Sequence, residues 1–349
     1  MKNSAISCED VNKRFDNTVA VHGLSFDLQP GELLSLLGPS GCGKTTALRL
    51  IAGFETPDSG RIFVGGTEVA GPKINLPPER RRVGMVVQDY ALFPHMSLRE
   101  NVAYALNGQS HSRVAELLGL VGLAGLDERM PHELSGGEQQ RGALARSLAS
   151  EPQAILLDEP FSNLDAALRA HVRAEVRGIL RAAGATAVFV THDIEEAFSL
   201  TDRVAVMFDG RIEQIATPRD LYRQPVTRRI AEWLGNANFL PGRGDGSQVE
   251  CELGRLPSDQ ATSGPVDVMV RPDWLTIATA RSDTGTGAVV DRIFYGHDQL
   301  IRVALDSGTT VQVRVLSDDE FLPGQRVTVG CQGPNVVFRQ GSAEDAGPR

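Results

Sequence analysis

The sequence of 349 residues has few cysteines, few aromatic residues and no excess of positive charge. Its four cysteines, Cys8, Cys42, Cys251 and Cys331, are scattered, which argues against a disulfide framework and a cysteine-based metal site. The net charge is −9, with 44 acidic against 35 basic residues, so no global positive field attracts nucleic acid. No apolar run approaches the roughly 18 residues that span a bilayer, and no secretory signal precedes the first domain. We expect a protein of the reducing cytosol that does not bind nucleic acid.

The length exceeds that of one ordinary domain and suggests two. Up to about residue 235, strand-like and helix-like stretches alternate, which indicates an α/β domain. The glycine- and asparagine-rich stretch Asn236–Gly246 has the composition of a linker. Beyond it nearly every stretch alternates as strands do, so residues 236–339 are predicted to form a small β-barrel. The last ten residues, 340–349, are expected to be disordered.

A phosphate-binding loop is the strongest single signal. The segment Gly38–Thr46 completes the pattern G-x-x-x-x-G-K-[ST], between a predicted buried strand, Leu33–Leu37, and a predicted helix, Ala47–Ala52. Glycines let backbone N–H groups turn inward to the phosphates, Lys44 adds positive charge, and the Thr45 hydroxyl is placed to ligate Mg²⁺. A glycine-rich turn without a ligand is disfavoured by this order of strand, loop and helix. The predicted nucleotide contacts are Gly38, Pro39, Ser40, Gly41, Cys42, Gly43, Lys44, Thr45 and Thr46.

Polar residues follow two further predicted strands. The strand Ala154–Leu157 delivers Asp158 and Glu159 at its carboxyl end, where ligands of open α/β sheets bind. Asp158 is suited to hold Mg²⁺ and Glu159 to orient or deprotonate the attacking water. The strand Ala187–Val190 leads to His192, which therefore leaves the same sheet edge and is placed to donate to a γ-phosphate.

Three other features are weaker when taken alone. Gln88 follows a predicted strand and is within reach of the metal or the attacking water. Phe15 lies in a polar context where its ring can stack on a purine, although packing in the core is the simpler interpretation. The run Arg80–Arg82 indicates a solvated face.

The segment Leu134–Arg141 opens a predicted helix. Ser135 is a candidate N-cap, and Gly136 and Gly137 leave the first backbone N–H groups open to an anion, which suggests a second phosphate site. A capped helix without a ligand is the alternative. The apolar loop Asp89–Met96 is typical of a surface that binds a partner.

In this order the motifs resemble those of the ATP-binding subunits of ABC transporters. The resemblance runs from about Ala5 to Leu234, and the β-rich remainder resembles the accessory, TOBE-type domain of importers for sugars, polyamines and ferric iron. It implies a RecA-like core, an antiparallel β subdomain, a helical subdomain at about 89–150 and an OB-like barrel. The matching segments are Gly38–Thr46 (Walker A), Gln88 (Q-loop), Leu134–Glu138 (signature), Ile155–Glu159 (Walker B), Ser162–Asp165 (D-loop) and His192 (switch).

The resemblance also implies a mechanism in which two copies pair head to tail. Each ATP, bound with Mg²⁺, is then held between Lys44 of one copy and the signature of the other, so hydrolysis opens the dimer. It implies catalysis by Glu159, His192, Gln88 and Lys44, a metal held by Thr45, Gln88 and Asp158, and adenine stacked on Phe15. The implied contacts across the dimer are Ser135, Gly136, Gly137, Glu138 and Asp165.

The implied partners are a membrane-spanning permease, whose coupling helix sits on the loop Gln88–Met96, and an extracytoplasmic binding protein that delivers the solute. The chain is then a peripheral protein at the cytoplasmic face of the inner membrane. Two stretches, Leu221–Pro225 and Cys251–Pro257, favour the ferric-iron importers. Polyamine, phosphonate, sulfate and sugar import stay open.

There are departures from the family pattern. The stretch Leu106–Leu134 is short for the helical subdomain, Asn163 stands where alanine is frequent, and Glu138 replaces a glutamine. Neither Asn163 nor Glu138 is expected to touch the chemistry. A soluble ABC ATPase acting on ribosomes or DNA is the alternative function, disfavoured by a single cassette and the absence of sustained heptads. A ligand-sensing role of the C-terminal domain also stays open.

Overall fold

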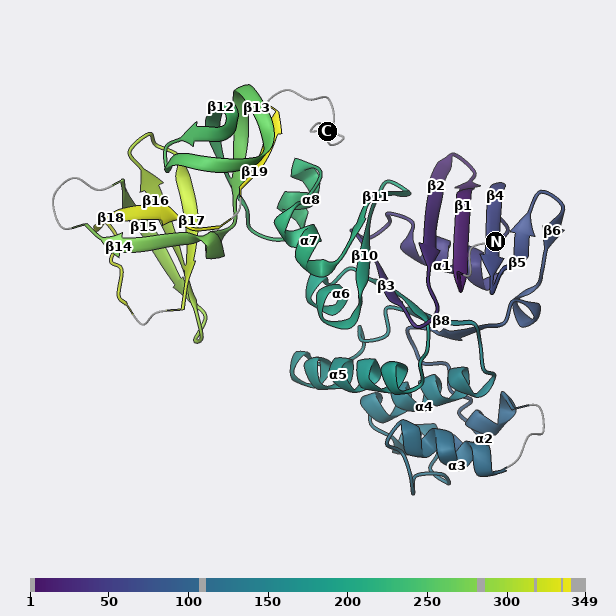
Figure 1. The fold of residues 1–349 in the computed structure, drawn as a ribbon. Helices are drawn as coiled ribbons and strands as arrows, with labels where there is room; N and C mark the ends of the chain where they lie inside the picture. The colour runs from purple at the N-terminus through teal and green to yellow at the C-terminus, as the bar shows by residue number, and fades with distance from the viewer. Residues whose placement is uncertain (1–3, 107–110, 281–285, 317–318, 334, 340–349) are drawn as a thin grey trace. The chain divides into compact units, whose positions relative to one another are not determined.

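A computed structural model of the chain describes residues 4–106, 111–280, 286–316, 319–333 and 335–339. The predicted tail 340–349 lies outside these residues. Contacts divide the chain into two compact units, Met1–Pro218 and Arg219–Arg349 (Figure 1). None of the helices in the described part of the chain is long and apolar enough to cross a membrane.

The first unit begins with an antiparallel sheet whose strand order is β2-β1-β4-β5-β6. The predicted small sheet before and after the phosphate loop is therefore confirmed. A 3₁₀ turn, Pro78–Arg80, follows it. The strands are β1 (Ile6–Phe15), β2 (Thr18–Leu28), β4 (Ser59–Val64), β5 (Thr67–Gly71) and β6 (Ile74–Asn75).

The second sheet of this unit has the order β11-β10-β3-β9-β8-β7. Its strands are parallel except β11, which pairs antiparallel with β10. The five residues of β3 and of β9 are all buried, as expected when both faces of a parallel sheet are covered. The strands are β3 (Leu33–Leu37), β7 (Val83–Val86), β8 (Ala154–Asp158), β9 (Ala187–Thr191), β10 (Arg203–Phe208) and β11 (Arg211–Ala216).

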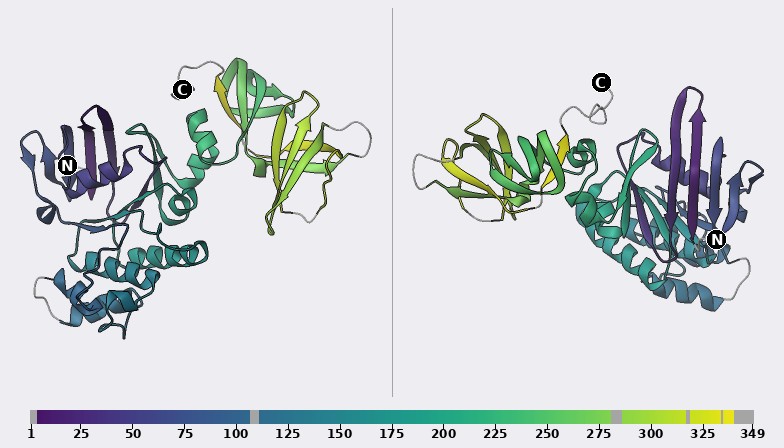
Figure 2. Two further views of the ribbon diagram at one scale, coloured as in Figure 1. Left: turned by 180° about the vertical axis from the view of Figure 1, so that it is seen from behind. Right: turned by 45° about the horizontal axis from the view of Figure 1, so that its top comes forward.

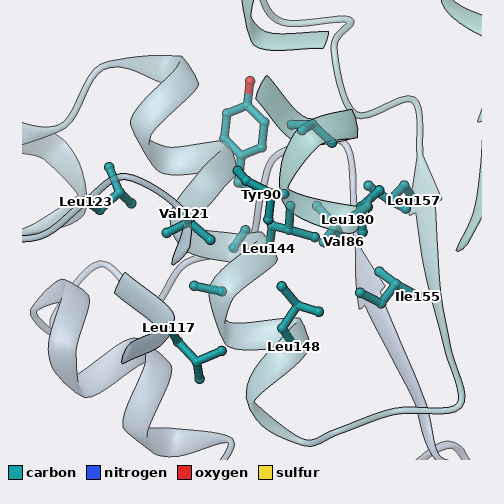
Figure 3. Packing of buried hydrophobic residues seen from close by; sticks show 14 of the residues in the cluster. Val86, Tyr90, Leu117, Val121, Leu123, Leu144, Leu148, Ile155, Leu157 and Leu180 are labelled. Atoms are coloured by element: carbon teal, nitrogen blue, oxygen red, sulfur yellow. The ribbon is translucent and has the colours of Figure 1, made fainter. Parts of the chain in front are cut away.

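Two hydrophobic clusters cover the two faces of this sheet. Along β8, Ile155 and Leu157 belong to the cluster with the helices of the helical subdomain (Figure 3), while Ala154 and Leu156 belong to the cluster with α1 and the antiparallel sheet. Successive side chains of a strand point to opposite faces, which produces this division. Figures 1 and 2 show helices α2 to α5 on one side of this second sheet and the antiparallel sheet on its other side. The helices are α1 (Lys44–Ala52), α2 (Leu98–Tyr104), α3 (His111–Leu120), α4 (Gly136–Ala149), α5 (Ala166–Ala182) and α6 (Ile194–Leu200), with a 3₁₀ turn at Pro131–Glu133.

The second unit is built mainly of strands, in two sheets ordered β12-β13-β19 and β14-β18-β15-β16-β17 around one core. The expectation of a small all-β unit is confirmed. Its elements are α7 (Pro218–Arg223), α8 (Arg228–Trp233), β12 (Asn238–Cys251), β13 (Gly254–Val270), a 3₁₀ turn (Pro272–Trp274), β14 (Leu275–Thr279), β15 (Gly287–Phe294), β16 (Gln299–Leu305), β17 (Thr310–Val315), β18 (Arg326–Cys331) and β19 (Val336–Arg339).

The predicted linker is wrong. Asn236–Gly246 lies mostly within β12, which pairs along its length with β13. Its glycines sit in a strand rather than in a flexible connection; a Cβ on Gly244, for example, would lie 2.5 Å from Thr262 Oγ1. Contacts place the division after Pro218, so α8 belongs to the second unit.

One buried arginine explains why α7 and α8 join the second unit. Arg271 is fully buried and donates to three backbone carbonyls: Tyr222 O at 3.2 and 3.3 Å, Ala231 O at 2.9 Å and Gly235 O at 3.1 Å. Its guanidinium also lies 4.3 Å from the centroid of the Tyr222 ring. These contacts tie both helices to the end of β13.

Candidate functional site

The phosphate loop connects the end of β3 to the start of α1. Gly41 and Gly43 have φ of 81° and 102°, values that L side chains rarely adopt. A Cβ on Gly43 would lie 2.1 Å from Ala20 O in β2, and one on Gly38 would lie 2.2 Å from Met207 O in β10. The loop therefore lies between β2 of the antiparallel sheet and β10 of the second sheet, and Gly38 and Gly43 are needed for this close approach.

Lys44 is the first residue of α1, and its side chain reaches back into the phosphate loop. Its side chain is buried, and Nζ donates to Gly38 O at 2.7 Å and Pro39 O at 2.9 Å. The Cys42 thiol lies 3.8 Å from the same nitrogen, and burial raises the pKa of this thiol. A buried ammonium ion whose partners are uncharged carbonyls leaves positive charge available to an anion in the loop.

Thr45 and Asp158, two of the three residues predicted to hold a metal, are joined by a hydrogen bond. Thr45 Oγ1 donates to Asp158 Oδ1 at 3.1 Å, across 113 residues of sequence. Partial burial raises the pKa of Asp158, and the adjacent Glu159 carboxylate raises it further. Gln88 and Asp158 line the same cavity of about 440 Å³, together with Arg49 and Met85. Oxygen donors on a half-buried carboxylate, hydroxyl and amide form a set that suits Mg²⁺.

Glu159 and His192 also meet, because β8 and β9 are parallel neighbours in which Asp158 pairs with Val190. The Glu159 N–H donates to Val190 O at 3.0 Å, and His192 Nδ1 lies 3.2 Å from Glu159 Oε1. Glu159 has a φ of 44°, and the Ser162 hydroxyl donates to its carbonyl at 3.0 Å. The backbone conformation of Glu159, uncommon for a non-glycine residue, is thus held in place from both sides.

Gln88 follows β7 with its side chain exposed. Its backbone carbonyl accepts a hydrogen bond from Asn163 Nδ2 at 3.1 Å, and the same nitrogen lies 3.2 Å from Asp89 Oδ1. Neither of these groups takes part in the proposed chemistry, so the expectation that Asn163 does not touch it stays a prediction. Asn163 ties the D-loop to the Q-loop within one chain.

The start of α4 is a capping box. Ser135 Oγ accepts from the Glu138 N–H, while Glu138 Oε2 accepts from the Ser135 N–H and hydroxyl, both at 2.7 Å. These two hydrogen bonds from Ser135 lower the pKa of Glu138. Glu138 therefore contacts Ser135, which is predicted to bind ATP, and its own implied contact across the dimer stays a prediction.

Two signature glycines pack closely. A Cβ on Gly136 would lie 3.0 Å from Leu164 Cδ2, and one on Gly137 would lie 3.0 Å from Val172 Cγ2. Asp165 caps α5, since its side chain accepts from the Leu168 N–H at 2.9 Å. Among the described residues, no hydrogen bond of Ser135, Glu138 or Asp165 reaches the phosphate loop of the same chain.

Phe15 ends β1 and is 41% exposed, with Lys13 Nζ 5.0 Å from its ring centroid. It pairs with Thr18 at the tip of the β1–β2 hairpin, and the same hairpin carries Ala20, which lies against Gly43. The ring is therefore open to solvent on the strand pair that borders the phosphate loop.

The prediction that the run Arg80–Arg82 forms a solvated face is wrong for Arg81. Arg81 is fully buried rather than solvated, and it donates to Leu50 O at 2.6 Å, Ile51 O at 3.1 Å and Leu76 O at 2.7 Å. It satisfies carbonyls at the C-terminal end of α1, the helix that begins at Lys44. No local pattern distinguishes Arg81 from its two neighbours, because its role depends on the packing of α1 against the start of β7.

The family description "ABC transporter" matches residues 21–162, and "TOBE domain" matches residues 268–338. Among solved structures, cbiO1 from Clostridium perfringens, part of the ABC transporter complex cbiONQ, aligns with a TM-score of 0.58 and 27% identity over 63% of this chain and 91% of that one. The dimeric ATP-binding cassette MJ0796, bound to ADP and Pi, aligns with a TM-score of 0.52 and 29% identity over 61% of this chain and 99% of that one. The chain is an ATPase that belongs to the ABC transporter family.

Similar curated proteins are named as iron importers. The Fe(3+) ions import ATP-binding protein FbpC of Rhizobium etli is 42% identical over 97% of this chain and 98% of its own length. FbpC 2 of Rhodococcus jostii is 43% identical over 96% of this chain and 99% of its own length, and FbpC of Brucella abortus is 46% identical over 84% and 85%.

Proposed function

We propose that this chain is the ATP-hydrolysing subunit that powers import of iron(III) through a membrane permease. The observation that supports iron as the solute is the name shared by relatives that match it over most of their length. The two stretches that resemble ferric importers in sequence, Leu221–Pro225 and Cys251–Pro257, favour the same solute.

We infer the following roles within one chain. The loop N–H groups and Lys44 bind the phosphates, and Phe15 stacks on the adenine. Thr45, Asp158 and Gln88 would hold Mg²⁺, which would neutralise charge on the bound phosphates. Glu159 orients and deprotonates the attacking water.

His192 keeps Glu159 in position through the 3.2 Å contact between their side chains and is placed to donate to the γ-phosphate. The left-handed backbone of Glu159 leaves its carboxylate at the end of β8, beside the pair Thr45 and Asp158. The residues that would hold the metal, the phosphates and the attacking water thus lie at one edge of the sheet.

Two copies share each ATP. Among the described residues, the hydrogen bonds of Ser135, Glu138 and Asp165 do not reach the phosphate loop of the same chain. The backbone N–H groups at the start of α4 are suited to bind an anion, as helix N-termini are. The dimeric structure of the cassette MJ0796 supports the pairing of two copies. Ser135, Gly136 and Gly137 of one copy, with Glu138 and Asp165 beside them, then face the γ-phosphate bound by the other.

The apolar loop Gln88–Met96 is the proposed seat of the permease, which holds the chain at the cytoplasmic face of the inner membrane, and an extracytoplasmic binding protein delivers the solute. Uptake of radioactive iron into cells that express the permease, the binding protein and this chain tests the function. We expect uptake with the wild-type chain and none with Lys44→Ala.

Parallel uptake assays with a polyamine, a phosphonate, sulfate and a sugar define the solute. Uptake of one of these, but not of iron, dependent on Lys44 would replace iron as the solute. Uptake that does not depend on Lys44 would contradict the transport role itself.

A further inference from the structure

Arg146, in the second half of α4, contacts a segment that the site description leaves unexplained. Its Nη1 donates to Ala91 O at 2.7 Å and its Nη2 to Tyr90 O at 3.2 Å. The guanidinium carbon also lies 5.1 Å from the centroid of the Phe93 ring. One side chain of the signature helix therefore binds the backbone just beyond Gln88.

The two residues whose carbonyls Arg146 binds have uncommon backbone conformations. Tyr90 has a φ of 59° and Ala91 a φ of 49°, both in the left-handed region that non-glycine residues seldom adopt. Such conformations persist where the surroundings over-determine them. The planar guanidinium, with donors fixed in a fork, is suited to fixing two successive carbonyls at once.

Asn101 of α2 fixes the rest of the segment. It is fully buried; Oδ1 accepts from the Phe93 N–H at 2.8 Å, and Nδ2 donates to Phe93 O at 3.2 Å and Met96 O at 3.0 Å. Its Oδ1 also lies 3.5 Å from Arg146 Nη1. The segment Tyr90–Met96 is thereby attached to both α2 and α4.

The same segment also lies near the start of α4. Tyr90 is buried in the cluster of the helical subdomain, with its hydroxyl directed away from Leu144 and Leu148 (Figure 3). A Cβ placed on Gly136 would lie 3.9 Å from that hydroxyl oxygen. The segment therefore contacts α4 at the signature and again at Arg146.

We propose that Arg146 is a positioning residue that makes the segment Tyr90–Met96 and helix α4 one rigid body. A displacement of this segment then moves the backbone donors at Ser135, Gly136 and Gly137 by a similar amount. This inference rests on the proposed function, in which the segment faces the permease and the start of α4 faces the ATP of the second copy.

The first test is ATP hydrolysis by the full-length protein carrying Arg146→Lys, which keeps the charge but cannot bind two carbonyls as a fork. We expect kcat to fall roughly 10- to 100-fold, since misplacing a positioned group by about 1 Å can cost 10²-fold. The KM for ATP and the affinity for a fluorescent ATP analogue stay within about twofold, because the phosphate loop is untouched. Arg113→Lys is the matched control, since the ion pairs of Arg113 within the described part of the chain are with Glu116 and Glu151.

Two further variants separate positioning from general stability. Phe93→Leu removes the ring beside the guanidinium, which also packs against Tyr104 with a centroid distance of 4.9 Å. We expect a smaller fall in kcat with the same unchanged KM. Ala91→Gly added to Arg146→Lys restores part of the lost kcat, because glycine adopts a positive φ without strain. An unchanged kcat in Arg146→Lys, or equal losses in Arg146→Lys and Arg113→Lys, would overturn the proposal.

Hydrogen exchange gives a readout that needs neither dimer nor permease. We expect amides 91–96 and amides 136–138 to exchange faster together in Arg146→Lys and in Phe93→Leu. Faster exchange at 91–96 with none at 136–138 would show that the two segments are not one body. If they exchange together while no ATP-driven dimer forms, the proposed function fails and the coupling stands.

Discussion

The two units of this protein differ in where they place uncommon backbone conformations. Among the described residues, every non-glycine residue with a positive φ lies in Met1–Pro218, and in Arg219–Arg349 only glycines adopt such angles. Three of the first unit's residues, Tyr90, Ala91 and Glu159, belong to the Q-loop segment and the Walker B end. Strained backbone persists where other contacts hold it and is concentrated at functional sites.

The two units also differ in the partners of their buried cationic side chains. In the first unit, Arg81 is buried against backbone carbonyls, whereas Lys44 is buried in the phosphate loop, where an anion can meet it. In the second unit, Arg271 is buried with its donors spent on three backbone carbonyls and an aromatic ring. Changes at the phosphate site of the first unit are therefore expected to lower ATP hydrolysis and to leave stability intact. Changes at Arg271 in the second unit are expected to lower stability and to leave ATP binding intact.

The largest expected effect on chemistry is that of Glu159→Gln. Loss of a general base costs roughly 10²–10⁴-fold in rate, so kcat should fall by that factor while ATP still binds. The thermal midpoint should change little, because glutamine keeps the shape of the side chain. Steady-state hydrolysis and nucleotide binding measure the two properties.

Glu116→Gln makes the same change of charge on an exposed side chain of α3 and serves as the control. Hydrolysis at the wild-type rate in Glu159→Gln would remove Glu159 from its proposed role. Equal losses in the two variants would show that charge alone, rather than the site, matters.

Arg271→Met should have the largest effect on stability. It leaves three buried carbonyls without their donor, which should destabilise the second unit by about 3 kcal/mol or more. Both tryptophans of the chain, Trp233 and Trp274, lie in this unit, so denaturation followed by tryptophan fluorescence reports on it alone. The affinity for ATP should not change.

Arg255→Met is the matched control, because Arg255 is exposed and its nearest carboxylate oxygen, on Glu250, lies 3.9 Å away. A fluorescence midpoint for Arg271→Met equal to that of this control would contradict the structural role of Arg271. Weakened ATP binding in Arg271→Met would break the contrast between the units.

The smallest expected effect depends on pH. Glu196 is buried, accepts a hydrogen bond from Thr191 Oγ1 at 2.6 Å, and has a pKa raised by burial. Because the folded-state pKa lies above the unfolded value, the charged form costs free energy at neutral pH, and the cost disappears as the pH falls toward the unfolded value. Glu196→Gln should raise stability by about 1 kcal/mol or less at pH 7, with a smaller gain at pH 5.

Thermal midpoints at both pH values measure this difference. Glu195→Gln, on an exposed neighbour, should show no such dependence. A gain for Glu196→Gln that grows as the pH falls would contradict the assignment.

The sequence predicts where the residues of the candidate site lie better than it predicts the packing of the chain. Gly38–Thr46, Asp158, Glu159 and His192 were predictable because loop glycines and strand ends carry their own local signals. The contacts of Arg81, Arg146 and Asn163 were not, since each binds backbone carbonyls distant in sequence. The composition of β12 is that of a linker, but Gly242 and Gly244 serve close packing against β13 rather than flexibility.

The central claim is that each ATP is shared between two copies. Lys44→Ala destroys the phosphate site of a copy and leaves its signature intact, while Ser135→Arg, at an exposed position, blocks the signature and leaves the phosphate site intact. Mixed one to one, half of the dimers should carry one complete site, so hydrolysis should recover to as much as about a quarter of the wild-type rate. If the mixture stays as inactive as each variant alone while mixed dimers form, the shared site is contradicted.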